Sequence, residues 1–131
     1  MLALIRFSMR TLFPAHAGMP GVGECDLKPF LEQFWREAAP VMKLGLALST
    51  ILYILTPIFT VYIPLPLFLL PRGLRDKHAD RASTSGIYLL RSATLLVTMV
   101  AGLAWGANAQ VRRRFALEPL SPDPGTWREG P

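Results

Sequence analysis

The sequence contains few of the side chains that build metal, redox or acid–base sites. Its single cysteine, Cys25, excludes an internal disulfide and a thiolate metal cluster. Neither of its two histidines, His16 and His78, lies in an apolar segment, whereas a haem held between membrane helices usually needs two histidines there. We find no carboxylate pair, phosphate-binding loop or metal-ligand spacing. We therefore predict that the chain is not an enzyme and uses no metal or cofactor.

The isolated cysteine and histidine have plain interpretations. We interpret Cys25 as a spare residue of the N-terminal segment, with lipidation as the alternative. We interpret His78 as a solvated loop residue, with contact to a quinone or a lipid headgroup as the alternative.

Two long segments have almost no charge. Residues 44–71 contain no charged side chain, and residues 86–107 contain only Arg91. A bilayer core of about 30 Å needs roughly 20 helical residues, so both segments are long enough to cross it. We predict apolar helices over 41–63, with a kink at Pro57, and over 83–107. Several prolines follow the first helix, so it either spans the bilayer or enters it and returns.

The remaining segments complete an all-α membrane protein. Residues 1–26 contain helix-breaking prolines and glycines, lack the order of a signal peptide and predict a disordered tail. Residues 115–131 predict a second, proline-rich tail. Between the tails, residues 27–114 predict a helical membrane domain. Its parts are a short interfacial amphipathic helix over 29–39 and a hairpin of the two apolar helices, joined by a basic loop over 72–82.

The predicted interfacial helix has one apolar and one polar face. Phe30, Leu31, Phe34 and Trp35 recur at helical spacing on the first face. Aromatic side chains on a short amphipathic helix are typical of the membrane–water interface, where we place Trp35. The alternative is packing against soluble protein.

Basic residues gather beside the apolar segments, and the net charge is +5. This placement favours anionic lipid headgroups over nucleic acid as the partner. Arg91 lies close enough to the end of its segment to reach the interface. The positive-inside rule predicts that both termini lie in the cytoplasm, because six basic residues flank the outer ends of the two apolar segments and four lie in the loop between them. The basic residues predicted at the interface are Arg72, Arg75, Lys77, Arg81, Arg91, Arg112, Arg113 and Arg114.

Small side chains form a stripe along the second apolar helix. Thr94, Thr98, Gly102 and Gly106 recur every four residues. Glycines at this spacing let two membrane helices approach closely. We therefore predict tight packing at this stripe, against the first apolar helix or against a partner.

The C-terminal half resembles a known bacterial segment. The matching features are Arg72, Arg75, His78 and Arg81, then residues 85–91, 102–106, 111–112, 115–117 and 122–127. They resemble a membrane segment that accompanies flavin oxidoreductases of the glucose–methanol–choline type, either as a neighbouring small protein or as an extension of the enzyme. One departure is Ala109-Gln110, where that segment has Asp-Pro. The flavin-binding fingerprint is absent, so the resemblance implies an accessory or anchoring role beside such an enzyme.

Two functions follow from the sequence. One is an accessory subunit that anchors a flavin oxidoreductase to the bacterial cytoplasmic membrane, with Trp127 in the tail as a candidate contact. The other is a free-standing structural or lipid-binding membrane protein. The residues do not separate the two functions, and the resemblance favours the first.

Overall fold

The computed structural model describes residues 1–15 and 20–118, and within these ranges the fold is all-α. The predicted fold class is confirmed at this level. The described residues form seven helices and two short 3₁₀ turns. In chain order these are α1 (Leu2–Leu12), η1 (Val22–Glu24), α2 (Lys28–Glu37), α3 (Pro40–Leu55), α4 (Pro57–Thr60), η2 (Leu67–Leu69), α5 (Arg72–Ser83), α6 (Tyr88–Ala107) and α7 (Ala109–Arg114).

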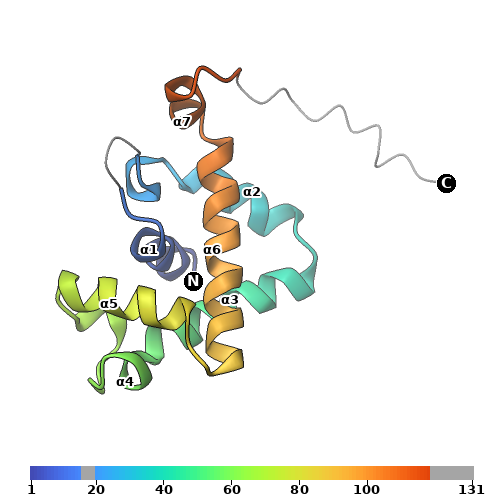
Figure 1. Ribbon diagram of the computed structural model, residues 1–131. Coiled ribbons are helices and arrows are strands. Elements are labelled where there is room, and N and C mark those ends of the chain that lie inside the picture. Colours follow the sequence, from blue (N-terminus) through green and yellow to red (C-terminus); the bar gives the residue numbers. More distant parts are fainter. Residues whose placement is uncertain (16–19, 119–131) are drawn as a thin grey trace.

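Helix α6 is the central element. Figure 1 shows it running the length of the molecule, with α7 above one end and the turn from α5 at the other. Helices α1, α3 and α5 all contact it, and α1 also contacts α3. The largest buried cluster therefore joins residues far apart in the sequence, such as Ile5, Leu46 and Val97.

The N-terminal segment is a core element, which makes the prediction of a disordered tail over 1–26 wrong for its described residues. Helix α1 buries Ile5, Ser8 and Met9, which share one face because they are three and four residues apart. Ile5 and Met9 are fully inaccessible to solvent. The breakers on which the prediction depended begin at Pro14, after the helix ends.

Helix α2 matches the predicted amphipathic helix closely. The Asp26 carboxylate accepts a hydrogen bond from the Lys28 backbone N–H at 3.2 Å, and Pro29 lies in the first turn. Proline suits the first turn because a backbone N–H at that position would have no hydrogen-bond acceptor within the helix, so its absence costs nothing. Leu31 is buried, and Trp35 is half-buried against the main core.

The first apolar helix is shorter than predicted. Helix α3 ends at Leu55, and Pro57 begins the separate one-turn α4. Proline interrupts the helix because it lacks the N–H donor that the preceding turn needs. The chain then turns at Tyr62, whose φ of 61° is unusual for a side-chain-bearing residue.

The described residues do not show the predicted hairpin of two membrane-crossing helices. Among the described residues, α6 alone is long and apolar enough to cross a membrane. The 16 residues of α3 extend about 24 Å, against about 30 Å for a bilayer core.

The predicted basic loop over 72–82 is helix α5. Pro71 precedes its first residue, and His78, Ala79 and Ala82 form its buried face. Small side chains on this face let α5 approach α4 and α6, which it contacts. Helix α6 then begins at Tyr88, later than the predicted residue 83, after the Ser85 hydroxyl accepts a hydrogen bond from the Ile87 N–H at 3.1 Å.

Candidate functional site

Large apolar side chains remain exposed along α3 and α6. On α3, Leu44 and Leu55 are each 61% exposed, and Leu48 and Ile51 between them are 56% and 36% exposed. On α6, Leu95 is 57%, Met99 58% and Leu103 64% exposed. The spacing of three or four residues puts each set on one side of its helix. We call these two stripes together the apolar face.

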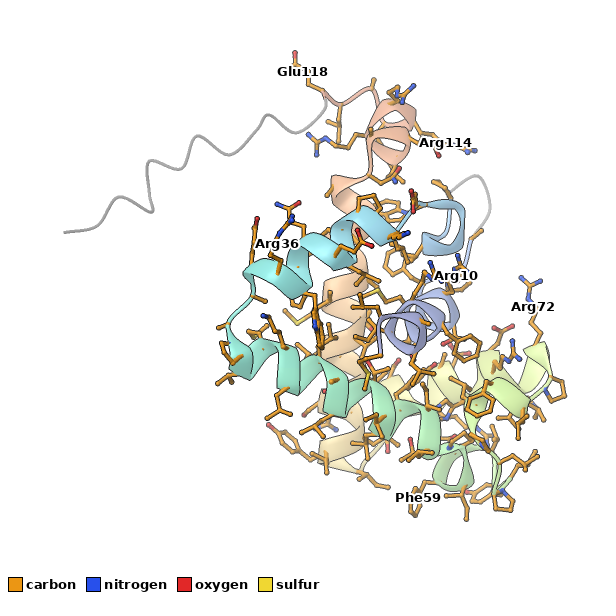
Figure 2. The ribbon with its side chains drawn as sticks, turned by 180° about the vertical axis from the view of Figure 1, so that it is seen from behind. Arg10, Arg36, Phe59, Arg72, Arg114 and Glu118 are labelled. Carbon is orange, nitrogen blue, oxygen red and sulfur yellow. The ribbon has the colours of Figure 1, made fainter. Side chains whose placement is uncertain are left out.

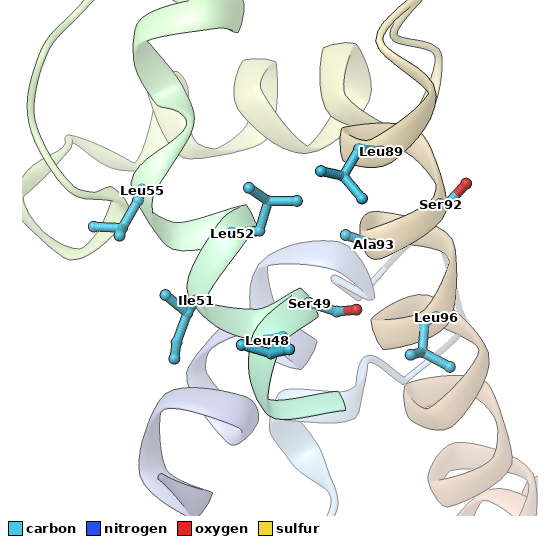
Figure 3. A pocket seen from close by; sticks show the side chains of 9 residues that line it. All are labelled: Leu48, Ser49, Ile51, Leu52, Leu55, Leu89, Ser92, Ala93 and Leu96. Atoms are coloured by element: carbon cyan, nitrogen blue, oxygen red, sulfur yellow. The ribbon is translucent and has the colours of Figure 1, made fainter. Parts of the chain in front are cut away.

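An open apolar groove lies between α3 and α6. Figure 3 shows Leu52, Leu89 and Ala93 facing the gap between the two helices. The groove has a volume of about 540 Å³, and its only side-chain oxygens are serine hydroxyls. Its lining residues are Leu48, Ser49, Ile51, Leu52, Leu55, Leu89, Ser92, Ala93 and Leu96.

The stripe of small residues divides into two halves. Thr94 is buried and donates its hydroxyl to the Leu90 carbonyl at 2.8 Å, and Thr98 donates to the Thr94 carbonyl at the same distance. Gly102 and Gly106 face open space, because a Cβ at either would meet no atom of the described residues within 4 Å. Gly102 and Gly106 therefore do not bring two of the described helices together, and the alternative, packing against a partner, stays a prediction.

A different glycine lies at the approach of α3 to α6. A Cβ added to Gly45 would stand 3.7 Å from the Leu96 side chain, in ordinary van der Waals contact. The sequence signal that could have found this position is the short stripe of Gly45 and Ser49.

Two of the predicted interface residues on α5 also have structural roles. Arg75 donates to the Phe68 carbonyl at 3.0 Å, and its guanidinium lies 5.1 Å from the centre of the Phe7 ring. Arg81 donates to the Thr60 carbonyl. Arg72 and Lys77 are exposed. Figure 2 shows Arg72 extending away from the helices.

Arginines also lie at both ends of α6. Arg91, in the first turn, is exposed; it donates to the Ser85 carbonyl at 3.1 Å and stacks on the Tyr88 ring at 5.9 Å. Arg112 donates to the Glu118 carbonyl at 2.6 Å. Arg113 and Arg114 are exposed beyond the other end. The basic residues thus form separate groups and not one patch. Figure 2 shows one of them, Arg114, at the opposite end of the molecule from Phe59.

His78 is buried, so its interpretation as a solvated loop residue is wrong. Its Nδ1 lies 2.6 Å from the Thr60 hydroxyl, and its Nε2 lies 2.8 Å from the Tyr53 carbonyl oxygen. Burial lowers the pKa of His78, and the hydrogen bond to Tyr53 opposes that shift in part. Sequence reasoning missed Thr60 and Tyr53, since nothing in the spacing of 53, 60 and 78 indicates that they meet.

Cys25 belongs to the main core. It is 6% exposed, and its thiol contacts the Gly21 carbonyl at 3.7 Å. The structure therefore places it inside the fold and not in a tail. His16 and Trp127 lie outside the described residues.

Among residues 1–15 and 20–118, no three His, Cys, Asp or Glu side chains gather in a way that could hold a metal ion. No protein-family model, curated protein or solved structure matches this chain. The resemblance to the segment that accompanies flavin oxidoreductases therefore stays a prediction. The apolar face is the feature of the fold that bears most directly on function.

Proposed function

We propose that this chain is a non-catalytic membrane protein that contacts the lipid bilayer through its apolar face. One observation carries the proposal: the outer sides of α3 and α6 expose large apolar side chains along their whole length. Soluble monomers rarely expose a continuous apolar surface of this kind, because each leucine-sized side chain moved out of water contributes about 1.5–3 kcal/mol. Lipid tails can cover such a surface without a specific partner.

The dimensions of α6 support this proposal. Its 20 residues extend about 30 Å, which matches the hydrocarbon core of a bilayer. Arg91 lies near one end, and Arg112, Arg113 and Arg114 follow the other. Arginines at these heights can reach the headgroups on the two sides. The bacterial cytoplasmic membrane is part of the proposal. Both termini lie in the cytoplasm only if a second segment crosses the bilayer beside α6, and a C-terminal reporter that is active only in the periplasm tests this orientation.

Alkaline carbonate extraction of membranes from expressing cells tests the main proposal. We expect the wild-type chain to stay in the membrane pellet. The double variant Met99→Asp/Leu103→Asp should shift to the supernatant, because it puts two charges into the apolar face. Gln33→Asp is the control, since that residue is exposed on the polar side of α2. Release of the wild-type chain by carbonate would refute integral insertion.

A second proposed role is to anchor a flavin oxidoreductase to the membrane. The resemblance suggests it, and the open side of α6 at Gly102 and Gly106 leaves room for a partner helix. Affinity purification in mild detergent, with the neighbouring genes expressed together, tests this role. Failure of any flavoprotein to co-purify would leave the lipid-contacting function alone.

A further inference from the structure

A polar hollow lies at the end of the molecule where α3 ends and α6 begins. It has a volume of about 370 Å³ and differs from the apolar groove in chemistry, since it combines a guanidinium, hydroxyl groups and two aromatic rings. It is formed by α4, the turn after α4, the last turn of α5, and the connection from α5 to α6. Its lining residues are Phe59, Thr60, Tyr62, Arg81, Thr84 and Ser85.

Arg81 and Ser85 have donors to offer in the hollow, and the hydroxyl of the exposed Tyr62 is a third. Arg81 gives one hydrogen bond to the Thr60 carbonyl, out of the five N–H donors of a guanidinium. The Ser85 oxygen accepts from the Ile87 N–H at 3.1 Å, which leaves its own O–H to donate. Thr84 contributes no donor, because its hydroxyl donates to the Asp80 carbonyl at 3.0 Å.

A second positive side chain and the N-terminus of α6 adjoin the hollow, and the carbonyl end of α5 lies there as well. Arg91 donates to the Ser85 carbonyl at 3.1 Å, so a second guanidinium lies beside it. The positive end of the α6 dipole begins just after Ser85, and the first turn of α6 contains no acidic residue.

The hollow and the apolar groove are lined by residues that are close along the chain, on the two sides of the break at Pro57 and of the start of α6. Leu55 lines the groove and Phe59 lines the hollow, four residues apart; Leu89 and Ser85 are also four residues apart. From Leu89 to Leu96 the groove continues for about 10 Å along α6, at 1.5 Å per residue. In Figure 1, α4 and the turn from α5 into α6 lie at the same end of α6.

We propose that the hollow and the groove together bind one anionic phospholipid. The phosphate accepts hydrogen bonds from Arg81 and Ser85, and one acyl chain lies along the groove between α3 and α6. The rim fits a headgroup region, because Phe59 is 62% and Tyr62 is 80% exposed and aromatic side chains prefer that depth of a bilayer. A nucleic acid or an acidic peptide would leave the leucine-lined groove empty. This inference rests on the proposed membrane function and adds the chemistry of one bound lipid to it.

Native mass spectrometry of the full chain, released from detergent micelles, tests the inference. The protein is titrated with phosphatidylglycerol and, separately, with phosphatidylcholine of the same acyl chains. We expect one phosphatidylglycerol to bind in preference to phosphatidylcholine. Arg81→Gln should weaken phosphatidylglycerol binding about tenfold, because a charge-assisted hydrogen-bonding group is lost. Arg72→Gln, on the same helix but outside the hollow, should bind as the wild type does.

Two more variants test the contact with the lipid headgroup and the contact with the acyl chain separately. Arg81→Lys keeps the positive charge that binds the phosphate. It should therefore bind phosphatidylglycerol more tightly than Arg81→Gln does. Ser49→Phe narrows the groove and should weaken binding of both lipids equally. Thermal melting of each variant in the same detergent confirms that it is folded before it is titrated.

The contrary outcomes are distinct. Equal binding of the two lipids, or equal losses for Arg81→Gln and Arg72→Gln, would overturn the headgroup site. Inorganic phosphate that displaces the lipid fully, with no effect of Ser49→Phe, would show an anion site without an acyl chain and would also overturn the inference. Either result leaves the proposed membrane function standing, provided that carbonate does not extract the wild-type chain; extraction would remove the function itself.

Discussion

The imidazole of His78 lies 2.6 Å from the hydroxyl of Thr60, and this contact joins α5 to α4 inside the fold. Its other nitrogen, Nε2, lies 2.8 Å from the Tyr53 carbonyl on α3. Because a carbonyl oxygen only accepts, Nε2 carries the proton and the neutral ring accepts from Thr60 through Nδ1. The Tyr53 hydroxyl lies 2.9 Å from that of Thr11, so the polar contacts extend to α1.

Removing the imidazole should destabilise the protein. His78→Ala removes the shorter hydrogen bond of both the Tyr53 carbonyl and the Thr60 hydroxyl, which keep only longer contacts of 3.4 Å to the Thr56 hydroxyl and 3.3 Å to the Pro57 carbonyl. This should lower the free energy of unfolding by on the order of 2 kcal/mol. Lys77→Ala is the matched control, because Lys77 is the exposed neighbour on the same helix. Thermal melts of both variants in one detergent measure the difference. Equal melting temperatures would contradict a structural role for these hydrogen bonds.

Stability should depend on pH through the same residue. Burial lowers the pKa of His78 below its ordinary value of 6.5. The unfolded chain therefore takes up a proton before the folded chain does as pH falls, and the free energy of unfolding decreases below pH 6.5. The decrease should level off below the lowered pKa. Melting temperatures of the wild type and His78→Gln across this range test it, and the two profiles should differ in slope only below pH 6.5.

The N-terminal helix should be necessary for stability. Met9→Ala removes a fully buried side chain from the main core and should cost about 2–5 kcal/mol. Leu4→Ala on the same helix is the control, because Leu4 is 37% exposed. Chemical unfolding in detergent measures both. If Met9→Ala unfolds no more easily than Leu4→Ala, the packing of α1 against α3 and α6 is contradicted.

Two glycines should respond oppositely to alanine. A Cβ at Gly21 would collide with the Ala15 backbone nitrogen and lie 2.8 Å from the Pro14 carbonyl carbon, so Gly21→Ala should lower the melting temperature. A Cβ at Gly102 meets nothing, so Gly102→Ala should raise the stability of α6 by up to about 1 kcal/mol through helix propensity.

Melting at several protein concentrations shows whether the open side of Gly102 faces lipid or solvent, or is covered by another chain. A loss of stability that appears only when the protein is concentrated would show that its open side is covered by another chain. A loss at every concentration would contradict the open space around it.

Particular elements show where sequence reasoning succeeded. The helix over 29–39 was predictable because its aromatic side chains and its proline lie within ten consecutive residues, and local spacing decides such a pattern. The end of α6 at Ala107 was predictable because the apolar residues stop there. The break at Pro57 was predictable for the same local reason, although its consequence was larger than a kink.

Other elements were not predictable from local pattern. Helix α1 is short and is followed by prolines and glycines, and its stability depends on contacts with α3 and α6. Helix α5 has a strongly charged sequence, and a buried face of one histidine and two alanines gives little apolar periodicity.

The sequence by itself determined that this protein is helical and basic and that residues 86–107 are long and apolar enough to cross a bilayer, because length, charge and proline placement act locally. Only the structure showed that the first apolar helix ends at Leu55 and is too short to do the same. The tertiary structure decided which side of α6 is covered and which is exposed. It also decided that His78 is buried, that Gly102 and Gly106 face open space, and that Arg81 and Ser85 meet in one hollow. The physical reason is that burial and hydrogen bonding depend on residues that are distant along the chain, such as 53 and 78. No local periodicity in the sequence indicates that such residues lie close together in the fold.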